Sequence, residues 1–211
     1  MKRLEVALSL IPDGCVLADI GCDHGLLCLR ALETGKAIKT YACDISAKSL
    51  DKARKALKGK NSECIESDGL KRVPRDFTAV SVCGMGADTM LGILADYDGA
   101  ATLVLQPQTE AGEVRKTLTE KLGYRLTREI TACERERFYP VMRFEKGEQR
   151  LDDLQLLFGL HAHTPTEELV GMCAKLKKKY SAYKPTERSE RLLVAIDEVL
   201  KNAADFKNEN R

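Results

Sequence analysis

The feature that most constrains the fold is a regular alternation of short apolar runs and longer helical patterns between residues 16 and 144. The apolar runs are four to six residues long and rich in β-forming side chains, as expected for strands buried on both faces. Such alternation predicts a parallel, doubly wound sheet. The expected strands are 16–20, 38–43, 63–66, 78–83 and 102–106, and the expected helices are 26–33, 46–57, 87–95 and 110–122.

The pattern changes after residue 122. The segments 124–132 and 138–145 have the character of two strands with little helix between them, which predicts an antiparallel finish at the edge of a seven-stranded sheet. This ending is unlike the second mononucleotide-binding half of an NAD enzyme. The chain becomes helical after residue 147, so we expect a sheet domain over 1–150 and a helical hairpin over 151–211.

The expected hairpin begins where Thr164 serves as N-cap, Pro165 takes the first helical position and Glu167 completes a capping box. A break at 184–186 then starts a second helix. Apolar residues recur at steps of three and four, which is typical of two helices packed antiparallel. These residues are Leu169, Cys173, Leu176, Tyr180 and Tyr183 in the first helix, and Leu193, Ile196, Leu200 and Ala203 in the second.

The composition is that of an ordinary globular protein, with 44% hydrophobic residues, 31% charged residues and a net charge of +2. No apolar run approaches the roughly 18 residues of a membrane span, and the acidic Glu5 argues against a secretory signal, so a cytoplasmic protein is expected. The eight cysteines form no CxxC pair and are expected to be buried thiols rather than disulfides or a metal site.

The segment 17–25 ends the first strand in Asp19-Ile20-Gly21, followed by Cys22, Asp23 and His24. Gly21 permits a tight turn where a ligand approaches the carboxyl end of the strand. The GxGxxG pattern that holds a pyrophosphate is absent, and Asp23 places an anion there instead. This favours a ligand with a cationic sulfonium and an amino group. The alternative is a plain strand-to-helix turn with Asp23 as N-cap.

Two further acids follow the second and third strands. Asp44, followed by Ile45, lies 23 residues after Gly21, where an acid accepts hydrogen bonds from ribose hydroxyls; its alternative role is to cap the next helix. Asp68 and Gly69 follow the third strand, where an acid accepts from an adenine amino group; the alternative is an ordinary Asp-Gly turn.

The fourth and fifth strands end in polar and glycine-rich motifs. Cys83-Gly84-Met85-Gly86 leaves space beside the first motif for a group that accepts a transfer, or serves only as a packing turn. Gln106, in Gln106-Pro107-Gln108, has an amide that matches the pairing edge of adenine; otherwise Pro107 merely ends the strand.

These motifs resemble the TrmK family of bacterial tRNA adenine-22 N1-methyltransferases over roughly residues 3–146. Gln108 stands where the family often has Asn, and Leu26 where it often has an aromatic residue. The matching residues are Arg3-Leu4, Ile11-Pro12, Ala18 to His24, Asp68-Gly69-Leu70, Cys83 to Gly86, Leu105-Gln106-Pro107 and Phe138-Tyr139.

The resemblance implies a Rossmann-like class I methyltransferase sheet, mostly parallel with an antiparallel final strand, followed by a C-terminal coiled-coil hairpin. It implies S-adenosylmethionine as cofactor, tRNA as substrate and a monomer or weak dimer. Asp23 and Gln106 are the expected catalytic residues. The expected cofactor-binding residues are Asp19, Gly21, Cys22, Asp23, His24, Asp44, Ile45, Asp68, Gly69, Cys83, Gly84, Met85 and Gly86. The basic run Lys175, Lys177, Lys178 and Lys179 is expected to contact the RNA backbone, with a solvated helix face as the alternative.

Adenine N1 carries an in-plane lone pair, so it attacks a methyl group without prior loss of a proton, and catalysis rests mainly on alignment. Asp23 is expected to stabilise the charge that develops on the base. Two alternatives stay open: methylation of another RNA base or a small molecule, and an RNA-binding module that keeps a cofactor pocket without turnover. No metal site is expected, because His161 and His163 have no Cys or His partner at metal-binding spacing.

Overall fold

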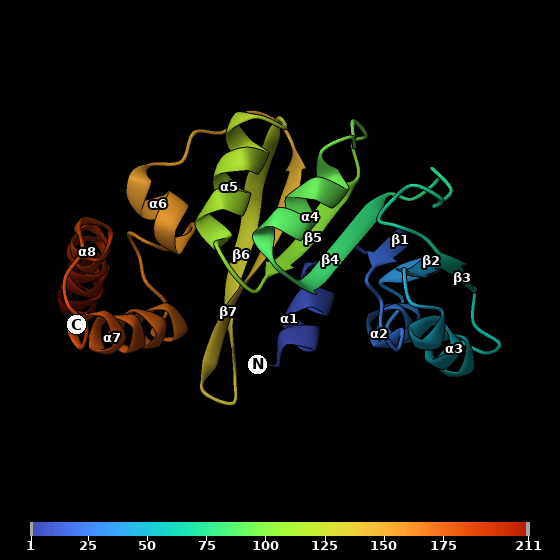
Figure 1. Cartoon of the computed structure of the whole chain (residues 1–211), viewed down its shortest axis with the longest axis horizontal. Coiled ribbons are helices and arrows are strands. Elements are labelled where there is room, and N and C mark those ends of the chain that lie inside the picture. Colours follow the sequence, from blue (N-terminus) through green and yellow to red (C-terminus); the bar gives the residue numbers. More distant parts are fainter. Residues whose placement is uncertain (1, 210–211) are drawn as a thin grey trace.

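A computed structural model describes residues 2–209 and contains a seven-stranded sheet in the order β3-β2-β1-β4-β5-β7-β6 (Figure 1). The strands are β1 Cys15–Ile20, β2 Ala37–Asp44, β3 Ser62–Glu66, β4 Ala79–Met85, β5 Thr102–Pro107, β6 Tyr124–Glu134 and β7 Arg137–Lys146. The helices are α1 Arg3–Leu10, α2 Leu26–Glu33, α3 Ala47–Ala56, α4 Ala87–Leu94, α5 Ala111–Glu120, α6 Asp153–Phe158, α7 Glu167–Ser181 and α8 Glu187–Glu209.

The predicted doubly wound sheet with an antiparallel final strand is confirmed. Strands β1 to β5 pair in parallel, whereas β7 pairs antiparallel with both β5 and β6. The last strand of the chain is therefore inserted between β5 and β6, and β6 forms the edge. Arg135 and Glu136 join β6 to β7 in left-handed backbone conformations, which gives a tight turn.

Helices cover both faces of the sheet. On one face, α4 and α5 bury Met90, Leu94, Val114 and Leu118 against inward-facing residues of the strands. On the other face, α1 and α2 pack over β1 and β5, and α3 packs beside α2 over β2. The central strands β1, β4 and β5 are covered on both sides, which is why they are almost continuously buried and apolar.

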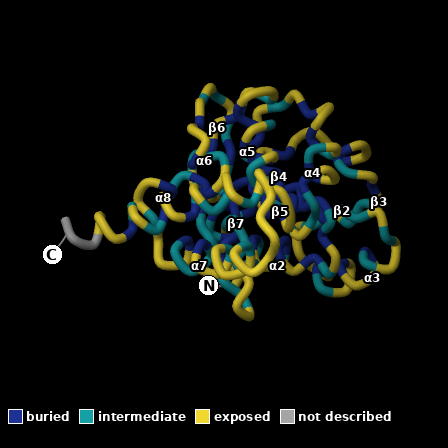
Figure 2. The backbone as a smooth tube through the Cα atoms, turned by 60° about the vertical axis from the view of Figure 1, so that its left-hand side comes forward, coloured by how far each residue is buried: buried dark blue, intermediate teal, exposed yellow. Residues whose placement is uncertain are grey.

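The C-terminal helices form the predicted hairpin, but its start and end differ from the prediction. The N-cap is Thr166, whose hydroxyl accepts from the Leu169 amide, and not Thr164; Thr166 offers the same hydroxyl two residues later. Leu169 and Cys173 are buried as expected. Tyr183 was wrongly placed in the interface: it is 68% exposed, because α7 ends at Ser181 before it. Figure 2 shows α8 extending away from the sheet.

Helix α6 lies between the sheet and the hairpin. Leu154 and Phe158 pack with the α7–α8 cluster, whereas Leu156 and Leu160 pack against the sheet core. The segment thus belongs to both layers, and the proposed domain boundary at residue 150 stays a prediction.

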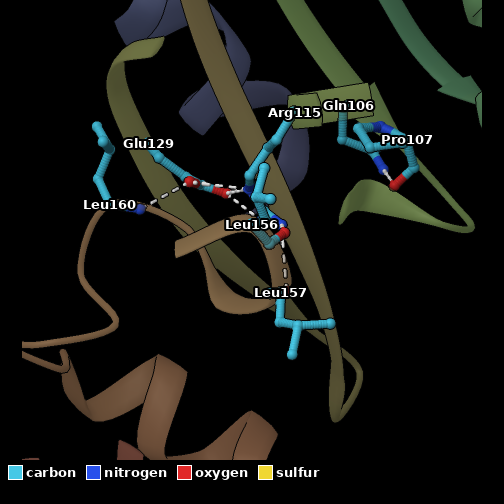
Figure 3. A network of polar contacts seen from close by, with 7 residues as sticks. All are labelled: Gln106, Pro107, Arg115, Glu129, Leu156, Leu157 and Leu160. Carbon is cyan, nitrogen blue, oxygen red and sulfur yellow. Dashed lines mark hydrogen bonds and ion pairs between the residues drawn. The ribbon is translucent and has the colours of Figure 1, made fainter. Parts of the chain in front are cut away.

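A buried ion pair joins α5, β6 and the α6 segment (Figure 3). The side chains of Arg115 and Glu129 are 2% and 4% exposed and lie 2.5 Å apart. Arg115 also donates to the carbonyl oxygens of Leu156, at 2.8 Å, and Leu157, while Glu129 accepts from the Leu160 amide at 3.1 Å. The further hydrogen bonds of the pair all go to backbone atoms of α6 and the residues after it, so the pair fixes α6 against the sheet.

All eight cysteines are free thiols, as predicted, and five of them are buried. Burial raises the pKa of Cys43 to about 12 and that of Cys173 to about 12. Within residues 2–209, no helix is both long and apolar enough to cross a bilayer. Nor does this part of the chain bring three or more His, Cys, Asp or Glu side chains into a cluster suited to a metal ion.

Candidate functional site

A cavity of about 850 Å³ opens at the carboxyl ends of β1, β2 and β4. In a doubly wound sheet this edge is where ligands bind. The predicted residues that line it are Gly21, Asp23, Asp44, Ile45, Asp68, Gly69, Cys83, Gly84 and Met85. Motifs separated by more than sixty residues in the sequence are therefore brought to one place by the parallel arrangement.

The turn after β1 is held by backbone contacts. The amides of Gly21 and Cys22 both donate to the carbonyl oxygen of Cys43, at 2.8 and 2.9 Å. Gly21 has a φ of +73°, and a Cβ placed there would lie 2.1 Å from the Met85 methyl group. Glycine is favoured here by the left-handed backbone conformation, and the Met85 methyl group occupies the space that a side chain would take.

Asp23 follows in a left-handed conformation with φ +47°, and its carboxylate is 72% exposed at the cavity. It is not the helix cap, because α2 begins after Gly25 without any side-chain cap. A non-glycine residue in this conformation is uncommon, and such strain recurs at ligand-binding positions. The capping alternative is thereby removed for Asp23.

Asp44 connects the first two loops of the site. Its Oδ2 accepts from the Asp23 amide at 3.1 Å, and its Oδ1 accepts from the Ser46 amide at 2.8 Å. Ser46, and not Asp44, is the N-cap of α3, since its hydroxyl accepts from the Ser49 amide. Each carboxylate oxygen has more than one lone pair, so Asp44 keeps acceptor capacity toward the cavity.

Another part of the cavity lining, around Asp68 and Gly69, combines an acidic side chain with apolar surface. Asp68 pairs with Lys71 at the solvent edge. Gly69, with φ +59°, packs against Ile93 of α4, where an added Cβ would lie 3.2 Å from that side chain. Ile45 projects beside them with 72% of its surface exposed. A large exposed aliphatic side chain next to acids offers a flat apolar contact for a planar ring.

The end of β4 contains a bulge between Cys83 and Met85, where Gly84 has a φ of +81°. The backbone amide of Gln108 donates to the Met85 carbonyl oxygen at 2.8 Å, and Gln108 lines the cavity. Gln106 does not line it. Its side chain is 2% exposed and donates to the Pro107 carbonyl oxygen at 2.9 Å, so the predicted role of Gln106 has no support from its position, whereas Gln108 has an accessible one.

Asp19 lies beneath the cavity rather than in its wall. It is 4% exposed and accepts hydrogen bonds from the Ser81 hydroxyl, at 2.6 Å, and from the Cys28 thiol. Burial raises the pKa of Asp19 to about 6, and the Ser81 and Cys28 hydrogen bonds act against that rise. Asp19 therefore joins β1 to β4 and α2 below the glycine turns.

Three other predicted residues also lie outside the cavity wall. Cys22 is buried with α2 and α3, and burial raises its thiol pKa far above the usual value. Gly86 is the N-cap of α4. His24 lies at the surface, with its Nε2 2.8 Å from the Lys52 ammonium and 3.4 Å from the Asp23 carboxylate. We interpret all three as residues that shape the turns around the site.

Several lining residues were not predicted from the sequence. Gln108 was noted only as a departure from the resembling family. The rest come from α1, the β3–β4 loop, α4 and the loop after α4, and no site role was predicted for them, because their approach to the cavity depends on the crossovers between strands. They are Arg3, Ser67, Leu70, Lys71, Arg75, Thr89, Gly92, Ile93, Asp96 and Tyr97.

The lysine run predicted to bind RNA lies exposed on α7. Lys175 donates to the Glu136 carbonyl in the β6–β7 turn at 2.5 Å, and Lys177 pairs with Asp197 of α8 at 2.7 Å. Lys178 is exposed, and Lys179 lies over the Tyr180 ring. Two of the four lysines thus have a hydrogen-bond or ion-pair partner within the chain, so the outward charge rests mainly on Lys178 and Lys179.

Comparison with known proteins identifies the class. The family model described as a methyltransferase domain matches residues 1–142, about two thirds of the chain, and the protein therefore belongs to the methyltransferase-domain family. The predicted resemblance to TrmK is confirmed by a Bacillus subtilis relative, a tRNA (adenine(22)-N(1))-methyltransferase, which is 32% identical over 157 residues. That match covers 70% of this chain and 66% of the relative.

Solved structures support the same fold over nearly the whole chain. TrmK of M. capricolum, in complex with S-adenosyl-homocysteine, superposes with a TM-score of 0.79 at 23% identity, covering 96% of each chain. TrmK of B. subtilis superposes with a TM-score of 0.76 at 24% identity, covering 97% of each chain. The C-terminal hairpin is included in these coverages, so it is part of the shared architecture.

Proposed function

We propose that this protein transfers a methyl group from S-adenosylmethionine to N1 of an adenine, position 22 in the D-arm, of tRNA. The observation that carries the proposal is the cavity at the sheet edge, where the carboxylates of Asp23, Asp44 and Asp68 and a glycine turn stand in place of the phosphate-binding pattern of nucleotide enzymes. The B. subtilis relative and the TrmK structures support the substrate and the cofactor.

The residues present fit this cofactor. Asp44 keeps acceptor capacity for the ribose hydroxyls, and Asp68 offers an acceptor near an adenine amino group. Ile45 supplies apolar contact for the adenine ring. The glycines at 21 and 84 leave the space in which the methionine portion would lie. When bound, the cofactor supplies an electrophilic methyl group on a positively charged sulfur.

The chain's own contribution is alignment and electrostatics. Gln108 offers an amide donor and acceptor at the cavity wall, which suits the pairing edge of an adenine. Methylation at N1 leaves the base cationic, and the exposed carboxylate of Asp23 is placed to stabilise that charge. Because N1 lies on the pairing edge, the base must leave its stack before it enters the cavity.

The test is methyl transfer to tRNA followed by nucleoside mass spectrometry. Purified protein, radiolabelled S-adenosylmethionine and an unmodified tRNA transcript with adenosine at position 22 should yield 1-methyladenosine. A transcript with guanosine at that position is the matched control and should stay unlabelled. Equal labelling of both transcripts, or binding without any turnover, would contradict the proposal.

A further inference from the structure

Arg3 is a cavity residue that the reaction described above does not use. It is the first residue of α1 and lines the cavity on the side of Cys83, where its charge acts to lower the thiol pKa against the dominant effect of burial. Lys71 and Arg75, the other two cations of the lining, come from the β3–β4 loop. Arg3 is therefore the cationic group of the β4 side, the side on which the proposed function puts the acceptor base.

The guanidinium of Arg3 is held from behind by the β6–β7 hairpin. Its Nε donates to the Glu134 carboxylate at 2.8 Å, and its Cζ lies 4.5 Å from the centroid of the Tyr139 ring. Arg3 correspondingly holds the pKa of Glu134 below its usual value. This contact occupies only the Nε edge of the guanidinium. Within residues 2–209, the two terminal nitrogens have no hydrogen-bond or ion-pair partner. Figure 1 shows α1 beside this hairpin.

A positive charge at this point has the wrong sign to assist the base itself. The base gains positive charge during methylation, so a guanidinium in contact with it would oppose the reaction. The anionic part of a nucleotide drawn out of its stack is its phosphate, and a guanidinium with two free terminal NH2 groups matches phosphate oxygens in a forked geometry. The side chain is 35% exposed, which leaves it accessible to such a partner.

We propose that Arg3 binds a phosphate that flanks the target adenosine and so holds the displaced nucleotide at the cavity mouth. The proposal rests on the proposed function and adds a binding residue to it. Glu134 and Tyr139 orient the guanidinium, and its charge is only partly offset by Glu134. The Lys175 contact with the Glu136 carbonyl ties the same turn to α7, so the phosphate site and the hairpin are joined through one structural element.

The experiment combines Arg3 variants with a tRNA in which neutral methylphosphonates replace the phosphates flanking the target adenosine. Losing one charge-assisted contact should raise the KM for tRNA about 10- to 100-fold in Arg3→Gln, with S-adenosylmethionine affinity unchanged. Arg3→Lys should recover part of the loss, because a point charge still attracts the phosphate. Arg30→Gln, which changes an exposed arginine on α2, is the matched control and should behave as wild type.

The decisive result is non-additivity. Wild type should lose about as much on the methylphosphonate tRNA as Arg3→Gln loses on normal tRNA, and Arg3→Gln should lose little more when both changes are combined. Fully additive losses would overturn the phosphate contact, and so would a normal KM in a folded Arg3→Gln protein. Absence of methyl transfer by wild type would instead contradict the proposed function, independently of Arg3.

Discussion

The cavity edge and the joint between α5, β6 and α6, formed by the buried Arg115–Glu129 pair, use polar groups in opposite ways. At the joint, Arg115 and Glu129 are almost fully buried, and their bonding groups are directed to each other and to backbone atoms of the α6 segment. At the cavity, Asp23 and Asp68 are 72% and 64% exposed. A polar group that is completely satisfied inside the protein fixes structure, whereas one left accessible keeps its bonding capacity for a ligand.

The two regions also differ in how they use glycine. Gly21 lines the cavity, and because it has no Cβ the methyl group of Met85, at the end of β4, can pack directly against it. Gly159 at the joint allows the chain to close directly over the ion pair, because an added Cβ there would lie 2.1 Å from a Glu129 oxygen. The first glycine supplies the backbone conformation of a turn that borders the cavity, and the second allows the backbone to pass close to the buried ion pair.

The largest effect is expected from breaking the joint. Glu129→Gln leaves the buried Arg115 without its counter-charge and should lower the free energy of unfolding by about 3–5 kcal/mol. Urea denaturation measures this. Glu187→Gln removes the partner of Arg191 in an ion pair whose two side chains are 81% and 80% exposed, and should leave the midpoint unchanged. Equal midpoints for both variants would show that the joint contributes no more than a surface pair.

The next effect concerns the buried acid under the cavity and depends on pH. The pKa of Asp19 is raised from 3.8 to about 6 in the folded protein, so folding favours its protonated form. Its contribution to stability is present below pH 4 and is lost as the pH rises through about 6, by on the order of 3 kcal/mol.

Asp19→Asn removes this titration while keeping an oxygen acceptor for Ser81. The variant should therefore gain stability relative to wild type as the pH rises from 4.5 to 7.5, measured by urea denaturation at each pH. A stability difference that stays constant over this range would mean that Asp19 titrates alike in the folded and unfolded chains.

Asp23 is the test of the open carboxylates. Asp23→Asn keeps the size of the side chain but removes its charge, and should slow methyl transfer about 10²-fold while the protein stays folded, as when a contact to developing charge is lost. Single-turnover rates at saturating cofactor and tRNA give the comparison. A rate within about twofold of wild type would assign Asp23 to the loop conformation alone.

The smallest effect is expected when the exposed lysines of α7 are replaced and tRNA binding is measured. Residues 164–191 carry seven basic and four acidic side chains, whereas residues 1–163 carry 24 of each. Replacing Lys178 and Lys179 by Gln should weaken tRNA binding and reduce its dependence on salt by a log–log slope of about 2, with cofactor affinity unchanged. Lys48→Gln with Lys58→Gln, on and after α3, is the control (Figure 1). Identical salt series for both proteins would leave the run as a solvated helix face.

The comparison also explains what the sequence could predict. The cavity edge was predictable because each parallel strand ends with a local signal, such as Gly21, Asp44 or Gly84, and the topology collects those ends. The joint was not, because Arg115 and Glu129 occur in an amphipathic helix and an edge strand where charged residues are normally exposed. Their burial results from α6 covering them, and no local pattern specifies where a short helix packs.

The same distinction applies to Gln106 and Gln108. Gln106 lies within β5, whereas Gln108 follows its last residue, Pro107. Strand alternation would place both side chains on the same face, so their different exposure depends on the exact residue at which the strand ends and the chain turns. The N-cap at Thr166 rather than Thr164 was missed for a similar reason, since two threonines two residues apart offer the same hydroxyl.

The insertion of β7 between β5 and β6 has a consequence for how the chain is made. Until residues 137–146 leave the ribosome, the edge of β5 has no hydrogen-bonding partner, although β6 has already been synthesised. An unpaired apolar edge of this kind is a template for association with other chains. A nascent or truncated chain that stops between residues 134 and 146 is therefore expected to aggregate, whereas one extended past Lys146 closes its own sheet.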